Sequence, residues 1–388
     1  MSTDRFSFIS FQFDTTRMPA DLWLMLGEGL SKCQHLAGVP LKPAAASSLA
    51  SVYLARGVAA TTAIEGNTLS ADEVQAIVDK GSAHVTESRA YLEREVQNVL
   101  AAIRDIDTAL QLGDRLPITI ERLEKLNAQV LEGIPDKPEV IPGKLREHDV
   151  AAGSYKAPHW TEVPGLLQRL VEWIRELRSG ATASERPEAK FTTAILTAIL
   201  AHLYIAWIHP FGNGNGRLAR LVEVQILSES GVVPLVATNL LSDHYNKTRH
   251  AYYLALDAAQ RDVNEFVRYA LRGFVDELRE QIGVVRNENL LIHWESYVYE
   301  TFRGKPSSKA RDRQRDVALA MKKDVVLTPE QVTELNTSLA RQYARAGGRT
   351  PARDMNVLVG MGLVESLGHR EYRARREIIE AFIPPTAA

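Results

Sequence analysis

The sequence predicts a mainly α-helical protein with one small β-hairpin and a C-terminal winged helix-turn-helix. Apolar residues recur at helical spacing along most of the chain. Five prolines interrupt this pattern between residues 135 and 165, where a short hairpin is expected. Near the C-terminus, two helix openings precede a glycine turn between short strands, which is typical of a winged helix. A chain of 388 residues is too long for one ordinary core, so we expect two or three domains.

The N-terminal third is expected to begin with a short strand and to continue as helices. The strand is predicted in the segment FSFISFQF, residues 6–13. Ser70 and Glu73 have the spacing of a capping box, which marks the start of a helix. Further helices are expected over residues 45–60, over residues 92–112 and after Thr119.

The central stretch FTTAILTAILAHLYIAWI, residues 191–208, carries no formal charge. Its length lies at the lower limit for a membrane span. It contains threonines and His202 and runs straight into a glycine-rich loop, so we expect a buried core helix and no membrane association. His202 is expected to pack there, because no zinc-binding spacing accompanies it. Helices are also expected over residues 166–177, 216–228, 244–260 and 264–282.

The C-terminal part begins with a predicted linker at 303–313 and continues with two similar helix openings. In TPEQVTEL, Thr328 is expected to cap a helix that has Pro329 at its first position and Gln331 closing the capping box. The segment TPARDMNVL repeats this opening at Thr350. Two capped helices followed by a hairpin predict the winged helix.

The charge of the C-terminal part differs from that of the whole chain. Residues 301–388 carry 16 Lys and Arg against 10 Asp and Glu, whereas the whole chain has a net charge of −2. A winged helix usually reads DNA with its second helix, so a DNA partner is one expectation and a docked protein partner is the alternative. Arg349 and Arg353 border that helix, and phosphate contacts are expected from Arg370, Arg373, Arg375 and Arg376.

The stretch HPFGNGNGRLAR, residues 209–220, places a histidine beside a glycine-rich loop and two arginines. Transfer of part of a nucleotide to a hydroxyl needs a proton acceptor, a cradle for the phosphates and neutralisation of their charge. The imidazole of His209 suits the first task. The N–H groups of Gly214 and Gly216 suit the second, at a helix N-terminus that favours anions. Arg217 and Arg220 share a helix face and suit the third.

This stretch resembles the Fic family signature, H-x-F-x-[DN]-G-N-G-R-x-x-R, at every fixed position. Fic proteins typically move AMP from ATP onto Ser, Thr or Tyr hydroxyls of target proteins, with Mg²⁺. The resemblance therefore implies a protein adenylyltransferase (AMPylator) with a Fic-type helical core, His209 as general base and Phe211 packed in the core. It implies nucleotide binding by Gly214, Asn215, Gly216, Arg217 and Arg220, with Arg220 on the terminal phosphate.

The resemblance also implies a domain division and a weakness in metal binding. The divisions are an N-terminal helical region with an inhibitory motif at 1–115, a Fic catalytic core at 116–285 and a winged-helix domain at 300–388. Asn213 stands where most members of the family have an acidic residue that binds the metal. An amide is a poorer Mg²⁺ ligand than a carboxylate, so reduced metal affinity is expected. The unaltered GNGR favours nucleotidyl over phosphoryl transfer.

The segment TTAIEGN, residues 61–67, is by itself a plausible helix end with Gly66 as its cap. It also resembles the family's inhibitory motif, [ST]-x-x-x-E-[GN], through Thr61, Glu65 and Gly66. Thr61 and Glu65 are four residues apart and share a helix face. Glu65 is expected to pair with Arg220 and to take it from the terminal phosphate, which implies a largely self-inhibited enzyme.

Two further resemblances concern the substrates. Residues 143–158 resemble the family's flap, which docks the target as an added strand. Edge contacts are expected from Leu145, His148 and Val150, and an ordinary surface hairpin is the alternative. The segment YYLALDAAQ resembles the lining of the adenine pocket and implies Tyr253 and Gln260 as contacts, with packing in the core as the alternative.

Two other functions stay open at this point. One is a DNA-binding regulator whose Fic core senses ATP, and the other is removal of AMP by the same site, with Glu65 orienting water. Cys33 is the only cysteine, and the first ten residues lack a basic segment followed by an apolar run. We therefore expect a cytoplasmic protein without a signal peptide. Dimers are common among relatives, so a homodimer is a further expectation.

Overall fold

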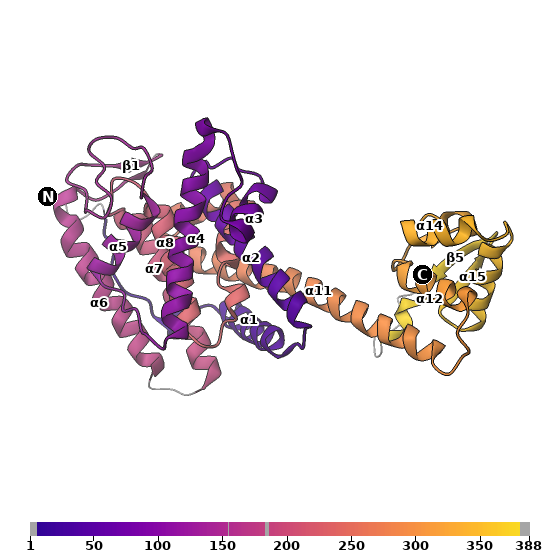
Figure 1. Cartoon of the computed structure of the whole chain (residues 1–388). Helices are drawn as coiled ribbons and strands as arrows, with labels where there is room; N and C mark the ends of the chain where they lie inside the picture. Colours follow the sequence, from indigo (N-terminus) through magenta and orange to yellow (C-terminus); the bar gives the residue numbers. More distant parts are fainter. Residues whose placement is uncertain (1–5, 154, 183–185, 381–388) are drawn as a thin grey trace. The chain divides into compact units, whose positions relative to one another are not determined.

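The computed structural model describes residues 6–153, 155–182 and 186–380, and it confirms the expected mainly α-helical class. The chain forms two compact units, residues 1–282 and 283–388, both drawn in Figure 1. The second unit begins inside helix α11 (Val263–Phe302), because Trp294 and Val298 of that helix belong to the second core. The expected divisions at residues 115 and 300 stay predictions.

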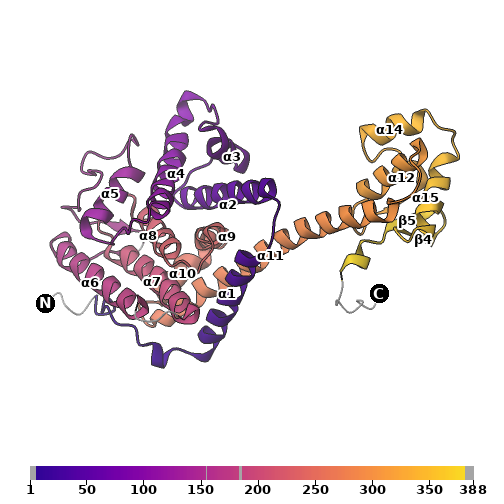
Figure 2. The same cartoon turned by 60° about the horizontal axis from the view of Figure 1, so that its bottom comes forward.

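Helix α7 (Pro187–Ile208) lies at the centre of the first unit. It packs against both α6 (Val163–Thr182) and α8 (Asn215–Glu229), and Figure 2 shows α6 and α7 side by side. Among the described residues, α7 alone is long and apolar enough to cross a bilayer, and 83% of that apolar stretch is buried inside the protein. The structure therefore has the expected core helix.

A buried polar network joins α7 to the helices that follow it in the chain. The imidazole of His202 is fully buried, with Nε2 2.8 Å from the Tyr252 hydroxyl and Nδ1 3.0 Å from a carboxylate oxygen of Glu223. The hydroxyl of Tyr245 donates to the other oxygen of Glu223 at 2.8 Å. Partners of this kind offset the cost of burying polar groups, so His202 is a packed core residue as expected.

Three further helices of the first unit, α2, α4 and α5, contact α8. Helix α1 contacts α7, α3 contacts α2 and α4, and α9 contacts α2 and α10. Ser70 and Glu73 form the expected capping box, and Thr119 accepts the Arg122 N–H at 3.1 Å as an N-cap. The bounds are α1 Ala20–Gly38, α2 Pro43–Ala63, α3 Ala71–Lys80, α4 Ala90–Gln111, α5 Ile120–Val130, α9 Leu240–Lys247 and α10 Arg249–Ala258.

The expected strand in residues 6–13 is wrong. The described backbone of this segment is a turn followed by irregular chain, with Phe11 at a φ of 56°. The ring of Phe8 lies 4.9 Å from that of Trp207, and the ring of Phe11 lies 5.0 Å from that of Tyr204. The alternating aromatic residues therefore pack onto α7, where they bury apolar area without a partner strand.

The proline-rich segment forms a very short hairpin. Strand β1 (Ala151–Ala152) pairs with β2 (Tyr155–Lys156) in antiparallel register. Paired strand was expected from Leu145, but the structure gives Leu145 only an isolated antiparallel bridge to Phe211. The hairpin is therefore tied at its base to the histidine loop.

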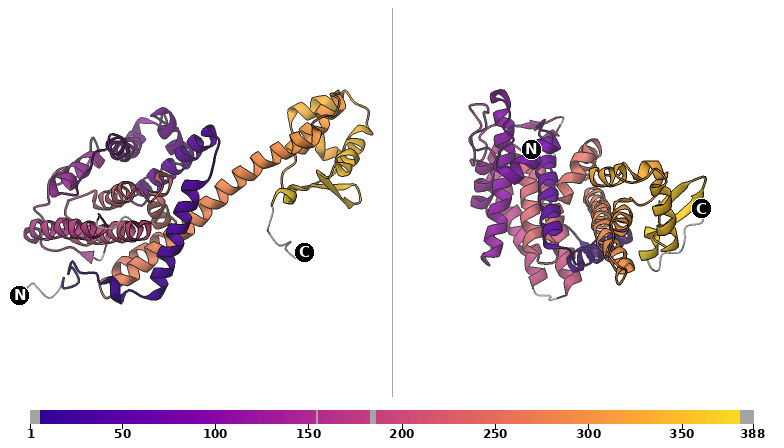
Figure 3. Two further views of the ribbon diagram at one scale, coloured as in Figure 1. Left: turned by 90° about the horizontal axis from the view of Figure 1, so that it is seen from below. Right: turned by 45° about the vertical axis from the view of Figure 1, so that its right-hand side comes forward.

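The second unit combines the end of α11 and helices α12 to α15 with a sheet of three described strands in the order β3-β5-β4. Figure 3 draws the strands of this unit as yellow arrows. Its elements are α12 Lys309–Ala320, β3 Val326–Leu327, α13 Pro329–Val332, α14 Thr337–Ala344, α15 Thr350–Gly360, β4 Val364–Gly368 and β5 Glu371–Ala374.

Three details of the second unit differ from expectation. Helix α14 stands between the two expected helices, capped by Asn336, which accepts the Leu339 N–H at 2.9 Å. Thr328 forms the expected capping box, whereas α15 has Arg349 as its N-cap with no side-chain cap bond. Helix α12 begins inside the expected linker because Ser308 caps it. The assignment as a winged helix stays a prediction.

Candidate active site

The loop after α7 is closed by its own side chains. His209 ends the helix in a left-handed conformation, φ 49° and ψ 61°, and Gly214 at φ 78° precedes α8. The Asn215 side chain accepts the Phe211 N–H at 2.9 Å and donates to the Phe211 carbonyl at 2.8 Å. Phe211 is 1% exposed, as the resemblance implied. Asn215 therefore offers an anion only its backbone N–H, at the start of α8.

The imidazole of His209 is oriented by the last turn of α7. Its Nδ1 lies 3.3 Å from the carbonyl oxygen of Ala206. A proton on Nδ1 leaves Nε2 with a free lone pair. Burial lowers the pKa of His209 below its ordinary value, and the charge of Arg146 acts in the same direction. The ring is therefore neutral near pH 7 and able to accept a proton.

Arg146, which sequence reasoning missed, ties the flap to this histidine. Its Nε donates to the His209 carbonyl at 2.8 Å, and its two amino groups donate to the carbonyls of His148 at 2.9 Å and Pro158 at 2.6 Å. The residue is only 3% exposed. One buried guanidinium thus fixes both ends of the flap against the loop, because its five donors diverge in a rigid plane.

Asn127 of α5 was also missed, and it holds the loop from the opposite side. Its amide nitrogen donates to the Asn213 carbonyl at 2.9 Å, and its amide oxygen accepts the Gly143 N–H at 3.0 Å. Gly214 packs so closely against this side chain that an added Cβ would lie 3.0 Å from the Asn127 nitrogen. The glycine is thus required by space as well as by its positive φ.

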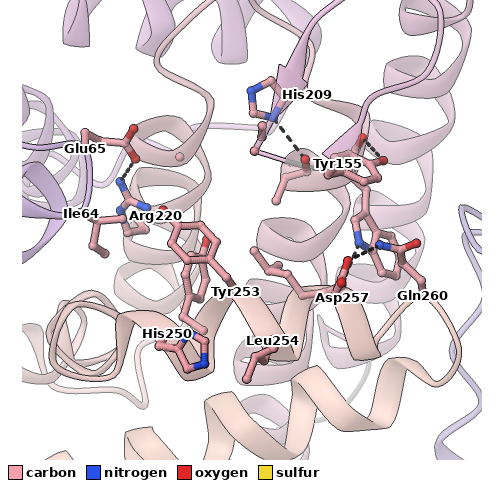
Figure 4. Close-up of a pocket in the computed structure, with 17 residues that line it drawn as sticks. Ile64, Glu65, Tyr155, His209, Arg220, His250, Tyr253, Leu254, Asp257 and Gln260 are labelled. Atoms are coloured by element: carbon pink, nitrogen blue, oxygen red, sulfur yellow. Dashed lines mark hydrogen bonds and ion pairs between the residues drawn. The ribbon is translucent and has the colours of Figure 1, made fainter.

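Arg220 is held by the end of α2. Its Nε donates to the Thr61 hydroxyl at 2.5 Å, and one amino group donates to the Thr61 carbonyl at 3.0 Å and to Glu65 Oε1 at 2.6 Å. Figure 4 shows the Glu65–Arg220 pair at one side of the pocket that His209 also lines. Gly66, at a φ of 101°, turns the chain just after Glu65. The structure therefore brings together the two residues that the sequence paired.

The Glu65–Arg220 pair is charged at neutral pH. Burial opposes the charge of Glu65, but Arg220 and Arg217 outweigh it and lower the pKa of the carboxyl. Burial also opposes the charge of Arg220, and Glu65 outweighs it and raises the pKa of the guanidinium. Arg220 is 1% exposed, whereas the Glu65 side chain is 26% exposed. The carboxylate is thus the partner that can leave the pair for water.

Arg217 is engaged by a residue that the sequence gave no reason to select. Its amino group donates to Glu95 Oε1 of α4 at 2.7 Å, and the Asn67 side chain donates to the other oxygen of Glu95 at 2.8 Å. The Nε of Arg217 is buried without a partner among the described residues. Asn67 is the last residue of the segment 61–67, so both arginines of the signature are linked to this segment at the end of α2.

Asn213 is turned toward Asp136. Its amide nitrogen donates to Asp136 Oδ2 at 2.5 Å, and its amide oxygen accepts the Gly214 N–H at 2.6 Å. Among the described residues, no group of three His, Cys, Asp or Glu side chains converges on a metal position. The carboxylate faces the amide nitrogen, and the amide oxygen also accepts from Arg217 at 3.4 Å. A turn of the Asn213 amide would bring its oxygen to the carboxylate, a pair that fits Mg²⁺ because this ion takes few protein ligands and completes its shell with substrate phosphates and water.

A cavity of about 590 Å³ joins these groups. Its wall includes Glu65, His209, Gly216, Arg220 and Tyr253, and Gln260 also lines it. Three flap residues also line the cavity: Ala152, Gly153 and Tyr155. The expected docking residues Leu145, His148 and Val150 are not part of the described cavity wall. Tyr253 is 52% exposed and is therefore not a core residue.

His209, Gly216 at the N-terminus of α8 and Arg220 line one cavity, and Arg217 directly follows Gly216. This arrangement suits phosphate-linked group transfer. The Fic/DOC family model matches residues 117–227, so the chain carries a Fic domain over those residues and the resemblance of residues 209–220 is confirmed. A protein adenylyltransferase fic-1 of Caenorhabditis briggsae is 30% identical over 233 residues, 59% of this chain and 41% of that protein. The Caenorhabditis elegans fic-1 is 30% identical over 235 residues. The chain thus spans about two-fifths of the relatives' length.

Solved structures give the same picture of the fold. Fic-1 of C. elegans superposes with a TM-score of 0.53 at 25% identity, over 69% of this chain and 74% of that one. A Fic family protein from Desulfovibrio desulfuricans G20 has a TM-score of 0.55 over 93% of this chain, at 20% identity, which supports the fold alone.

Proposed function

We propose that this protein transfers AMP from ATP to a Ser, Thr or Tyr hydroxyl of a target protein. The observation that carries the proposal is one cavity shared by His209, Gly216 and Arg220. The relatives' designation as protein adenylyltransferases supports the same chemistry. In that reaction the hydroxyl oxygen bonds to the α-phosphorus, the bond to the β-phosphate breaks, and pyrophosphate leaves.

Each residue of the loop has a defined task in this step. Nε2 of His209 takes the hydroxyl proton, and its lowered pKa keeps it free to do so near pH 7. The N–H groups at the start of α8 bind the phosphates. Arg217 and Arg220 neutralise the charge that develops on the leaving pyrophosphate. Asn213 and Asp136 would hold Mg²⁺, which when bound would neutralise further phosphate charge.

We further propose that Glu65 restrains this activity. In the pair observed at 2.6 Å, Glu65 occupies the donor of Arg220 that a terminal phosphate would need. An added Cβ at Gly216 would collide with Glu65 Oε1, so the carboxylate lies directly over the N-terminus of α8. A phosphate and this carboxylate therefore compete for the same space and the same charge.

The reverse reaction, removal of AMP from a modified protein, is the second candidate. It is favoured by the position of Glu65, which lines the same cavity as His209 and keeps its charge. Such a carboxylate is able to orient a water molecule toward a bound AMP ester. An AMP-modified peptide incubated with the wild-type protein separates this reaction from forward transfer.

The experiment that tests the proposed function uses His209→Ala in a chain that also carries Glu65→Gly. Intact mass spectrometry after incubation with ATP reports each added AMP on the protein or on a target. We expect the Glu65→Gly chain to gain AMP and the double variant to gain none, while both bind ATP equally. Full AMP incorporation by the double variant excludes His209 as the base.

A further inference from the structure

The second unit has a strip of positive charge that the site described above does not use. Four arginines follow one another at intervals of four residues, and all four side chains are exposed: Arg341, Arg345, Arg349 and Arg353. They occupy the end of α14, the turn after it and the start of α15. Among the described residues, none of the four has a carboxylate within ion-pair distance.

The segment that carries this strip has no exposed acid of its own. Between Glu334 and Glu365 the chain contains a single acidic residue, Asp354. That carboxylate is 2% exposed and accepts hydrogen bonds from Arg313 at 2.6 Å, from Gln314 at 2.8 Å and from the Tyr343 hydroxyl at 3.1 Å. Asp316 of α12 reaches α14, where it accepts from Gln342 at 3.0 Å. The segment therefore carries an excess of positive charge, which favours an extended polyanion as partner.

The other arginines expected to contact DNA behave differently. Arg370 donates to Glu330 at 2.6 Å, Arg373 donates to Glu365 at 2.6 Å, and Arg375 lies 3.7 Å from Glu377. Arg376 donates to the Met321 carbonyl and its guanidinium stacks over Trp294. These four guanidinium groups therefore already have partners within the protein, unlike those of the strip at the α14–α15 turn.

The geometry of α15 selects duplex DNA among polyanions. Arg349, Arg353 and Asn356 lie at intervals of four and three residues, which places them on one helix face. Arg353 and Asn356 are exposed, and arginine and asparagine are the residues that read guanine and adenine in the major groove. The Tyr372 hydroxyl of β5 donates to the Asn356 amide oxygen at 3.2 Å, so the following hairpin braces this helix.

We propose that the second unit binds duplex DNA, with the strip Arg341, Arg345, Arg349 and Arg353 on phosphates and the exposed face of α15 toward the major groove. The partner is recognised by its regular row of phosphates and a groove wide enough for a helix. This inference is independent of adenylyl transfer, because it involves no residue of the cavity around His209.

The test is fluorescence anisotropy of the full-length chain on a labelled duplex of about 30 base pairs, with salt raised from about 50 to 200 mM. Four phosphate contacts give a slope of log K against log salt of about −3.6, or roughly 150-fold weaker binding over that range. His209→Ala should bind as the wild type does. Changing all four arginines to Gln should abolish this salt-dependent binding, and R341Q with R345Q alone should reduce the slope by about 2.

A matched control removes four exposed cations elsewhere in the same unit, by changes to Gln at Arg303, Lys305, Lys309 and Lys322. We expect this control to keep the wild-type slope. Polyglutamate and phosphatidylserine vesicles serve as competing polyanions, and neither should displace the duplex at equal charge. No binding at about 50 mM salt, an equal loss in the control, or displacement by polyglutamate or by vesicles overturns the proposal.

Discussion

Removing the charge of Glu65 should release Arg220 for nucleotide. Glu65→Gln keeps the size of the side chain but loses the ionic hydrogen bond observed at 2.6 Å, and Glu65→Gly removes the side chain from above α8. A hydrogen bond between charged groups of this kind contributes about 1.5–3 kcal/mol. If ATP must break it in order to bind, its removal should lower the Kd for ATP roughly 10- to 140-fold.

The same change should lower the stability of the nucleotide-free protein. Arg220 is 1% exposed, and without Glu65 it keeps only its bonds to Thr61. An arginine that loses its buried partner destabilises the fold. We therefore expect a lower Tm without ATP, a larger rise of Tm on adding ATP, and faster AMP incorporation. Activity and stability should thus move in opposite directions.

Isothermal titration with ATP, thermal unfolding and intact mass measure the three effects on one preparation. Glu87→Gln is a matched control, because the Glu87 side chain is exposed and its carboxylate has no hydrogen-bond partner among the described residues. It should behave as the wild type in all three assays. If both Glu65 variants also kept the wild-type Kd and rate, Glu65 would not be a brake.

Three further predictions concern the groups around the loop. The kcat/KM of the Glu65→Gly chain should stay level as pH falls through 6.5 and decline only below it. The reason is that burial lowers the pKa of His209 and that the unprotonated ring is the base. A decline of kcat/KM centred above pH 6.5 contradicts this. Asn213→Asp should lower the Mg²⁺ concentration for half-maximal activity roughly tenfold, and an unchanged or higher requirement argues against a metal at Asp136. Arg146→Gln should lower the free energy of unfolding by about 3 kcal/mol, because three hydrogen bonds of a buried guanidinium are lost. It should also reduce AMP transfer to a target while the Kd for ATP stays unchanged. A change in ATP affinity alone contradicts the role of Arg146 in holding the flap.

The parts of the site that the sequence predicts are those that lie close together along the chain. His209 and the two arginines fall within twelve residues, so their spacing on a helix end carries the chemistry directly. Glu65 was found because its motif is contiguous and its proposed partner was already identified. The pairing itself depends on α2 packing beside α8, which the sequence alone does not display.

The missed residues reach the loop through tertiary packing. Asn127, Glu95 and Arg146 come from α5, α4 and the flap, and nothing in their local sequence marks them as partners of the loop. The same reason hid the ion pair of Arg373 from the sequence. Its partner Glu365 lies opposite it on the paired strands β4 and β5, a register that composition does not reveal.

Most of the buried and amphipathic helices were predicted because their periodicity is local. Three helix predictions fell short: α1 was not expected, the helix expected over 244–260 is divided into α9 and α10, and α11 continues past the expected end at 282 to Phe302. Two short segments were also misread. Residues 6–13 alternate as a strand does, yet their aromatic rings pack on α7. Helix α14 was absent from the expectation, because a polar stretch capped by Asn336 resembles a loop in composition.

The central claim is that the group transferred is AMP and that it passes through the cavity beside His209. The most direct measurement gives the Glu65→Gly chain ATP labelled at either the α- or the γ-phosphorus and follows the label on protein. The α-label should stay on the protein and the γ-label should leave as pyrophosphate, with both results lost in the His209→Ala background. Retention of the γ-label would show phosphoryl transfer and contradict the proposed reaction.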